Sequence, residues 1–196
     1  MECFVFPLSQ SNLFPLTTKP LNIFEAKYIQ MVEESIAAQI PIAIAYVPEN
    51  GDTYRTIAGY GIAQIIERRA DNSMLVFIQG QGKVRLGPQK NAKDSLYIVC
   101  ECEKIFEDLN LDDSLKAKYM NLSQLLVQWV QKHIPDQNQR EIFIRHLTGP
   151  QEIIGSFAAY LIRDYDLQYE MMEIFSLSEQ IQYLHRLFES NELTNG

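Results

Sequence analysis

Hydrophobic and polar positions follow two different rhythms along the chain. Up to about residue 106, short apolar runs and alternations are separated by turn-forming residues, a pattern typical of β-strands. From Asp112 onward, apolar residues recur every three or four positions, which is the period of an amphipathic helix. We therefore predict an α+β chain with a β-rich part at 1–110 and a helical part at 111–196.

The first part contains several short candidate strands. Residues 48–52 and 71–73 are rich in turn-forming residues and are predicted to connect strands. Gly80 and Gly82 are expected to interrupt a strand, and Gly87-Pro88 is expected to end one. Short strands with turns between them favour a closed or nearly closed barrel. The expected strands are 4–6, 42–47, 60–67, 74–78, 83–86 and 97–106.

One helix is expected within this β-rich part. Phe24, Tyr28, Val32 and Ile36 recur every four residues and form one apolar face. Asn22 is expected to cap this helix, with Glu25 completing a capping box. The helix should end before Pro41.

The second part reads as a small helical bundle. A long amphipathic helix is expected to begin near Asp112 or Asp113 and to stop at Pro135, and Ser176 with Glu179 forms a second candidate capping box. The shorter helices are expected near 140–147, 150–162, 167–175 and 177–188. The apolar face of the long helix comprises Leu115, Tyr119, Leu122, Leu126, Trp129 and His133.

The net charge limits the expected partners, and the cysteines indicate the expected cellular compartment. The net charge is −8, so nucleic acid and anionic membranes are not expected partners. Residues 106–196 hold 7 basic and 14 acidic residues, so the acidity belongs to the second part. No signal peptide or membrane span is visible. Three cysteines, Cys3, Cys100 and Cys102, fit reduced thiols in a cytoplasmic protein better than a disulfide framework.

Motifs for catalysis, cofactors or metals do not emerge from the sequence. The glycines around Gly80 and Gly59 lack the spacing and the following helix of a nucleotide loop, and read as turns or bulges. The three histidines lack metal-ligand spacing, and a zinc site at the cysteines would need a fourth ligand. We therefore predict no catalytic residue, cofactor or metal. Exposed aromatics in a groove would suit peptide binding, and Tyr54, in a polar loop, is expected to be exposed.

Three motifs stand at the opening of the chain: Phe-Pro-Leu at 6–8, Leu-Phe-Pro at 13–15 and Pro-Leu-Asn-Ile-Phe-Glu-Ala-Lys-Tyr at 20–28. In this order they resemble the opening of the Lon protease N-terminal (substrate-binding) domain family. Two positions depart from the pattern: Lys27 replaces the usual Arg, and Leu16 stands where the family usually has Gly. Segments 59–65, 78–86 and 97–103 and the closing helices are also similar to the family.

The resemblance implies a PUA-like β pseudo-barrel with one inserted helix, followed by an α-helical bundle. It also implies a stand-alone module that binds unfolded polypeptide segments or a protein partner, or that acts as an adaptor. The module is expected to be non-catalytic, because the nucleotide loop and the Ser–Lys protease segments of full-length Lon are not found. Phe24 and Tyr28 would then pin the helix to the barrel. The candidate peptide-binding residues are Phe14, Tyr54, Tyr60, Gln79 and Arg85.

Two alternatives to peptide binding stay open at this point. One is an enzyme with an unrecognised site in a cleft. The other is a PUA-like RNA-binding module, against which the net charge of −8 argues.

Overall fold

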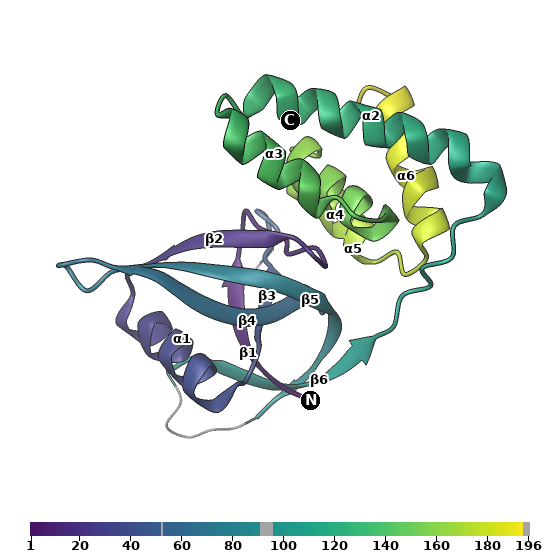
Figure 1. The fold of residues 1–196 in the computed structure, drawn as a ribbon. Helices are drawn as coiled ribbons and strands as arrows, with labels where there is room; N and C mark the ends of the chain where they lie inside the picture. Colours follow the sequence, from purple (N-terminus) through teal and green to yellow (C-terminus); the bar gives the residue numbers. More distant parts are fainter. Residues whose placement is uncertain (52, 91–95, 194–196) are drawn as a thin grey trace. The chain divides into compact units, whose positions relative to one another are not determined.

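The protein is described by a computed structural model that covers residues 1–51, 53–90 and 96–193. The chain divides into two compact units, Met1–Ile105 and Phe106–Gly196. Six strands and six α-helices lie in the described residues (Figure 1), so the predicted α+β class is confirmed.

A six-stranded sheet forms the first unit. Its order is β2-β5-β4-β3-β1-β6, and β6 pairs with β5 as well, so the sheet closes on itself. The pairing of β1 with β3 is parallel and the other pairings are antiparallel. The strands are β1 Glu2–Leu8, β2 Thr18–Ile23, β3 Ile42–Tyr46, β4 Ile57–Arg68, β5 Met74–Gln89 and β6 Ile98–Ile105.

Strand β5 runs through the glycines that were expected to break it, so that prediction is wrong. Gly82 lies opposite Tyr60 and Gly80 opposite Gly61, which leaves Gln81 as the extra residue of a β-bulge. Gly80 is needed for close approach and not for a turn, because a Cβ there would lie 2.2 Å from the carbonyl oxygen of Phe14. The strand also continues past Gly87-Pro88, through a second irregularity against β6.

Strand β2 occupies residues that were expected to start a helix. Asn22 pairs with Leu75 in the sheet, and helix α1, Ala26–Ala38, begins after Glu25 without a side-chain cap. The predicted capping box is therefore wrong. Phe24 is 74% exposed and does not pin the helix, whereas the Tyr28 ring packs on Phe6 with centroids 4.3 Å apart.

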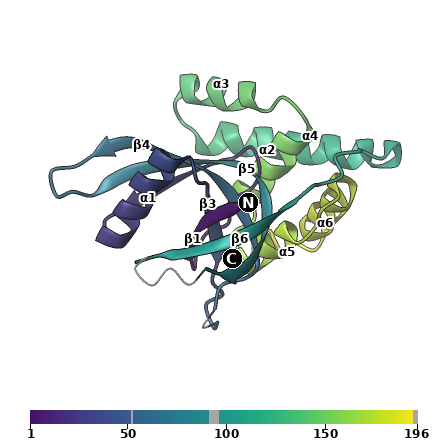
Figure 2. The ribbon, with the colours of Figure 1, turned by 90° about the horizontal axis from the view of Figure 1, so that it is seen from below.

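Both faces of the central strands are buried, which explains their unbroken apolar sequences. In β1, Phe4 and Phe6 join one hydrophobic cluster, while Cys3 and Val5 join a second cluster on the opposite face. Helix α1 contributes Met31 and other apolar residues to the first cluster and packs against β1 and β4 (Figures 1 and 2).

Five α-helices and one 3₁₀ turn form the second unit. The Asp112 side chain accepts a hydrogen bond from the Ser114 amide at 2.8 Å and so caps the 3₁₀ turn Asp113–Leu115, close to the predicted start. Helix α2 packs on α4 and α6, and α4 packs on α6. The helices are α2 Lys116–His133, α3 Gln137–His146, α4 Pro150–Leu161, α5 Tyr165–Met172 and α6 Leu177–Glu189.

The second predicted capping box is not formed. Ser176 stands at the N-cap of α6, but its side chain makes no cap hydrogen bond. Ser178 serves this junction instead, because its hydroxyl accepts from the Asp112 amide at 3.0 Å and donates to the Asn110 carbonyl at 2.9 Å. Among the described residues, no helix is long and apolar enough to cross a membrane.

Candidate functional site

An apolar cavity of about 360 Å³ lies in the helical unit, near the C-terminal ends of α2, α4 and α6. Its volume falls within the range of small-ligand and side-chain pockets. The lining residues are Leu125, Gln128, Trp129, Lys132, His133, Phe157, Tyr160, Leu161, Arg163, Phe188, Asn191 and Leu193.

A row of stacked rings forms one wall of this cavity and continues beyond it. The Trp129 ring stacks on His133 at 4.8 Å and on Tyr160 at 5.5 Å between centroids, and Phe143 of α3 meets Tyr160 edge-on at 5.4 Å. Three helices thus supply one aromatic row. Because Trp129 is half-buried and Tyr160 is 38% exposed, both rings keep surface that a ligand can cover.

Helical spacing explains how these side chains meet. Trp129, Lys132 and His133 are three and four residues apart, so they share one face of α2. On α4, Phe157 is fully buried and forms the floor, while Tyr160 follows one turn later.

The end of α6 and the residues after it also line the cavity. Asn191 adopts a left-handed conformation, φ 61°, just after the helix, as is common at helix C-termini. Its amide donates to the Phe188 carbonyl at 3.2 Å, and the Glu192 amide donates to the Leu187 carbonyl at 3.0 Å. This turn brings Leu193, which is 7% exposed, to the cavity wall.

The rim of the cavity is cationic. Lys132, His133 and Arg163 line it, and no Asp or Glu among the described residues does. His133, on the face predicted to be apolar, is exposed, with its Nδ1 donating to the Trp129 carbonyl at 2.9 Å. Burial raises the pKa of Tyr160, which keeps its hydroxyl protonated as a hydrogen-bond donor.

The residues predicted for the site lie elsewhere, in the β unit, and in different environments. Phe14 and Tyr60 are buried, at 2% and 7% exposure, while Gln79 and Arg85 are exposed on β5. Tyr54, expected to be exposed, is half-buried because it packs against the second cluster. Its hydroxyl accepts from Gln89 at 3.1 Å, and burial raises its pKa.

Arg85 lies at a shallow depression of about 280 Å³ on the sheet. Glu101 and Glu103 share this depression with it. The guanidinium group therefore faces an acidic surface. A ligand there would need to compete with these carboxylates for Arg85.

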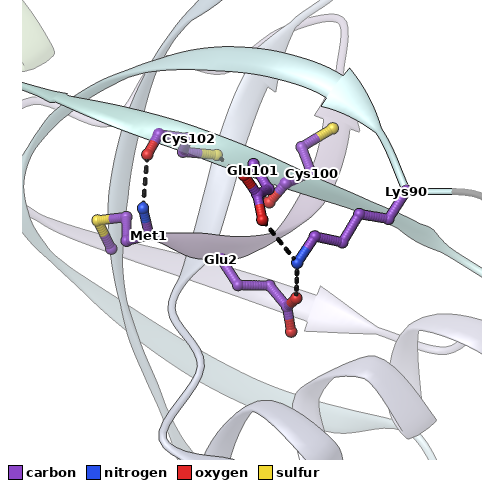
Figure 3. A network of polar contacts seen from close by, with 6 residues as sticks. All are labelled: Met1, Glu2, Lys90, Cys100, Glu101 and Cys102. Carbon is purple, nitrogen blue, oxygen red and sulfur yellow. Dashed lines mark hydrogen bonds and ion pairs between the residues drawn. The ribbon is translucent and has the colours of Figure 1, made fainter.

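A polar network fastens β1 to β6 in the β unit (Figure 3). Glu2 and Glu101 lie directly opposite each other in the ladder. Lys90 Nζ lies 2.6 Å from Glu2 Oε2 and 3.0 Å from Glu101 Oε1. Hydrogen bonds to the two carboxylates raise the pKa of Lys90, and Lys90 lowers the pKa of Glu101. The network is best explained as a clamp between strands.

The three cysteines are free and buried. A hydrogen bond with Cys102, together with burial, raises the pKa of Cys3, and the same hydrogen bond lowers the pKa of Cys102. Within the described ranges, no group of three or more His, Cys, Asp or Glu residues is arranged to hold a metal ion. The thiols therefore act as core side chains.

The sequence of the chain matches the model of a known domain family. The chain belongs to the family of the ATP-dependent protease La (LON) substrate-binding domain, whose model matches residues 2–190. This confirms the resemblance seen in the sequence. In Lon this domain is a non-catalytic module that binds polypeptide substrates.

Solved structures of the same fold support the assignment. A Lon N-terminal domain protein from Xanthomonas campestris is 13% identical, with a TM-score of 0.70, covering 94% of this chain and 96% of the other. The N-terminal domain of Mycobacterium avium complex Lon protease is 16% identical, with a TM-score of 0.70, covering 96% and 98%. The comparison with curated proteins gave no match.

Proposed function

We propose that this protein is a non-catalytic module that binds unfolded or extended polypeptide segments through the aromatic cavity of its helical unit. The β unit, as a PUA-like pseudo-barrel, and the helical bundle would act in the cytoplasm as a substrate receptor or adaptor. The observation that carries the proposal is the cavity of about 360 Å³ walled by Trp129 and Tyr160.

The cavity has the properties of a binding hot spot. Tyr and Trp rings are enriched at such positions because they bury a large apolar area and lose little conformational freedom. The rings here are held in place before any ligand arrives, since Trp129 stacks between His133 and Tyr160. Preorganisation of this kind lowers the entropic cost of binding.

The chemistry of the lining favours binding over catalysis. Among the described residues, the lining contains no Ser, Thr, Cys, Asp or Glu, so these residues supply neither a Ser, Thr or Cys nucleophile nor a pair of carboxylates. Lys132 can donate hydrogen bonds to a ligand and attract negative charge.

The single tryptophan makes the proposal directly testable, because Trp129 is the only Trp of the chain. We expect Trp-free unstructured peptides that contain Phe and Leu to shift its fluorescence emission on titration. By calorimetry, Trp129→Ala and Tyr160→Ala should each weaken binding about tenfold or more, whereas Trp129→Phe should retain most of it.

A matched control removes an exposed ring elsewhere. Phe24 is 74% exposed and does not line the cavity, so Phe24→Ala should leave the affinity unchanged. Equal losses in Phe24→Ala and Tyr160→Ala would show that peptides bind outside the cavity. The absence of any fluorescence or heat signal up to about 1 mM peptide would refute the proposed function.

A further inference from the structure

We propose that the cavity selects segments in which an aromatic or large aliphatic side chain is flanked by Asp or Glu. The inference rests on the proposed function and specifies its substrate class. The apolar side chain would enter the cavity, and the side-chain carboxylates would meet the rim formed by Lys132, His133 and Arg163.

The charge at the cavity is opposite to that of its surroundings. Residues 106–196 hold 7 Lys and Arg against 14 Asp and Glu. Two of the seven, Lys132 and Arg163, line the cavity, and none of the 14 acidic residues does. A carboxylate is therefore repelled by most of this unit but attracted at the cavity.

The two cations are available to a ligand. Lys132 and Arg163 are exposed, and neither forms an ion pair with another described residue. Other basic residues of the unit are already engaged: Lys116 lies 2.7 Å from Asp113, and Arg145 lies 3.7 Å from Glu141.

His133 adds a ring nitrogen with a fixed orientation. Its Nδ1 hydrogen bonds to the Trp129 carbonyl, and because a carbonyl only accepts, Nδ1 is the donor. The ring is also stacked on Trp129. Nε2 is thus the nitrogen left for a ligand, and when the imidazole is protonated it donates to a carboxylate.

Lys132 and Arg163 also lie at helix ends, where a purely structural role must be separated from ligand selection. Lys132 and His133 are in the last turn of α2, and Arg163 follows α4. Basic residues there offset the negative end of the helix dipole. Loss of that role lowers stability, whereas loss of ligand selection changes the order of peptide affinities.

The test uses three Trp-free peptides with acetylated and amidated ends, each with a central Phe flanked by Glu, Gln or Lys. We expect the Glu peptide to bind most tightly and the Lys peptide most weakly, with about a tenfold difference at low salt that shrinks as salt rises. The double variant Lys132→Glu/Arg163→Glu should reverse the order. The matched control Lys116→Glu/Arg145→Glu makes the same change of charge away from the cavity and should preserve it.

The outcomes separate the two proposals. Equal binding of all three peptides to the wild type, or an unchanged order in Lys132→Glu/Arg163→Glu, overturns the selectivity and leaves the proposed function intact. Reversal by the control variant also overturns it, because net charge would then explain the preference. No binding of any peptide refutes the proposed function itself. Thermal unfolding of each variant verifies that it is folded.

Discussion

Trp129 on α2 and Tyr160 on α4 stack with their ring centroids 5.5 Å apart. The contact joins two helices that pack on each other, and each helix also carries buried aliphatic residues, such as Leu126 on α2 and Ile154 on α4. It therefore contributes both to the stability of the helical unit and to the shape of the cavity.

Removal of the Tyr160 ring should expose Trp129 to water. We expect Tyr160→Ala to shift the Trp129 emission to longer wavelength and to lower the free energy of unfolding by about 1–2 kcal/mol, since part of the ring is already exposed. Tyr160→Phe, which keeps the stack, should have little effect on either. Fluorescence spectra and urea unfolding measure both quantities. Similar spectra for Tyr160→Ala and the wild type would contradict the stack.

Leu16 should be more favourable as glycine. It has φ 61°, a left-handed conformation that is costly for residues with a Cβ. We expect Leu16→Gly to raise the free energy of unfolding by about 0.5–1 kcal/mol in urea denaturation. Leu16→Ala, which keeps the Cβ, should give no such gain. A loss of stability in Leu16→Gly as large as that in Leu16→Ala would refute the strain.

Gly80 and Gly82 should respond differently to the same methyl group. In Gly80→Ala the Cβ would meet the Phe14 carbonyl oxygen at 2.2 Å, so backbone must move, and we expect a loss of about 3 kcal/mol or more. In Gly82→Ala the nearest atoms belong to the Tyr60 ring, at 3.2 Å, which can shift. Urea unfolding of the two variants gives the comparison, and equal losses would contradict the close approach.

The Lys90 clamp should make stability depend on pH in a defined direction. The pKa of Glu101 is lowered by Lys90, so its contribution is present above the ordinary Glu pKa and is lost as pH falls through the folded value. The pKa of Lys90 is raised, so its contribution is present below the ordinary Lys pKa and is lost as pH rises through the folded value. We therefore expect Lys90→Gln to destabilise most near neutral pH.

A second substitution verifies the origin of that loss. Lys90→Gln leaves Glu2 and Glu101 facing each other without a cation, and opposed like charges destabilise a strand pair. Glu101→Gln should restore part of the melting temperature in the Lys90→Gln background. Strictly additive effects in this double-mutant cycle would rule out the coupling.

The thiols should be protected in the native state. Cys3 and Cys100 have raised pKa values, the latter because of burial, and thiolate is the reactive form. We expect a thiol reagent to modify the folded protein slowly and to titrate all three cysteines after denaturation. Because Cys102 has the lowered pKa, Cys102→Ser should remove the fastest phase. Rapid modification of the folded protein would contradict the burial.

Features set by local pattern could be predicted from the sequence. The buried strand Ile42–Tyr46 and the long helix Lys116–His133 follow from an unbroken apolar run and a helical period. Strand β2 could not be predicted, because Thr18–Ile23 has no clear alternation and is a strand only through its partner β5. The glycines of β5 were misread for the same reason, since the close approach of residues 13 and 14 is tertiary.

The candidate site could also be predicted only where it depends on local pattern and not on tertiary contacts. Trp129 and His133 share a helix face in the sequence, and that much was predicted. Arg163 and Leu193 carry no sequence signal, because they reach the cavity through the ends of two other helices. The rings of Phe14 and Tyr60, two of the predicted peptide-binding residues, are buried. A family motif alone does not distinguish a ring that packs inside from one that faces a ligand.

The pairing of β5 with β2, β4 and β6 sets an order for folding. Strands β4 and β5 are joined by the turn at 69–73 and can form a hairpin locally. The pairing of Thr18 with Gln79, by contrast, closes a long loop and is slow to form. During synthesis, β2 leaves the ribosome well before its partner in the sheet exists. Its exposed backbone would then be available to other chains until residues 74–79, its partners in the sheet, have been synthesised.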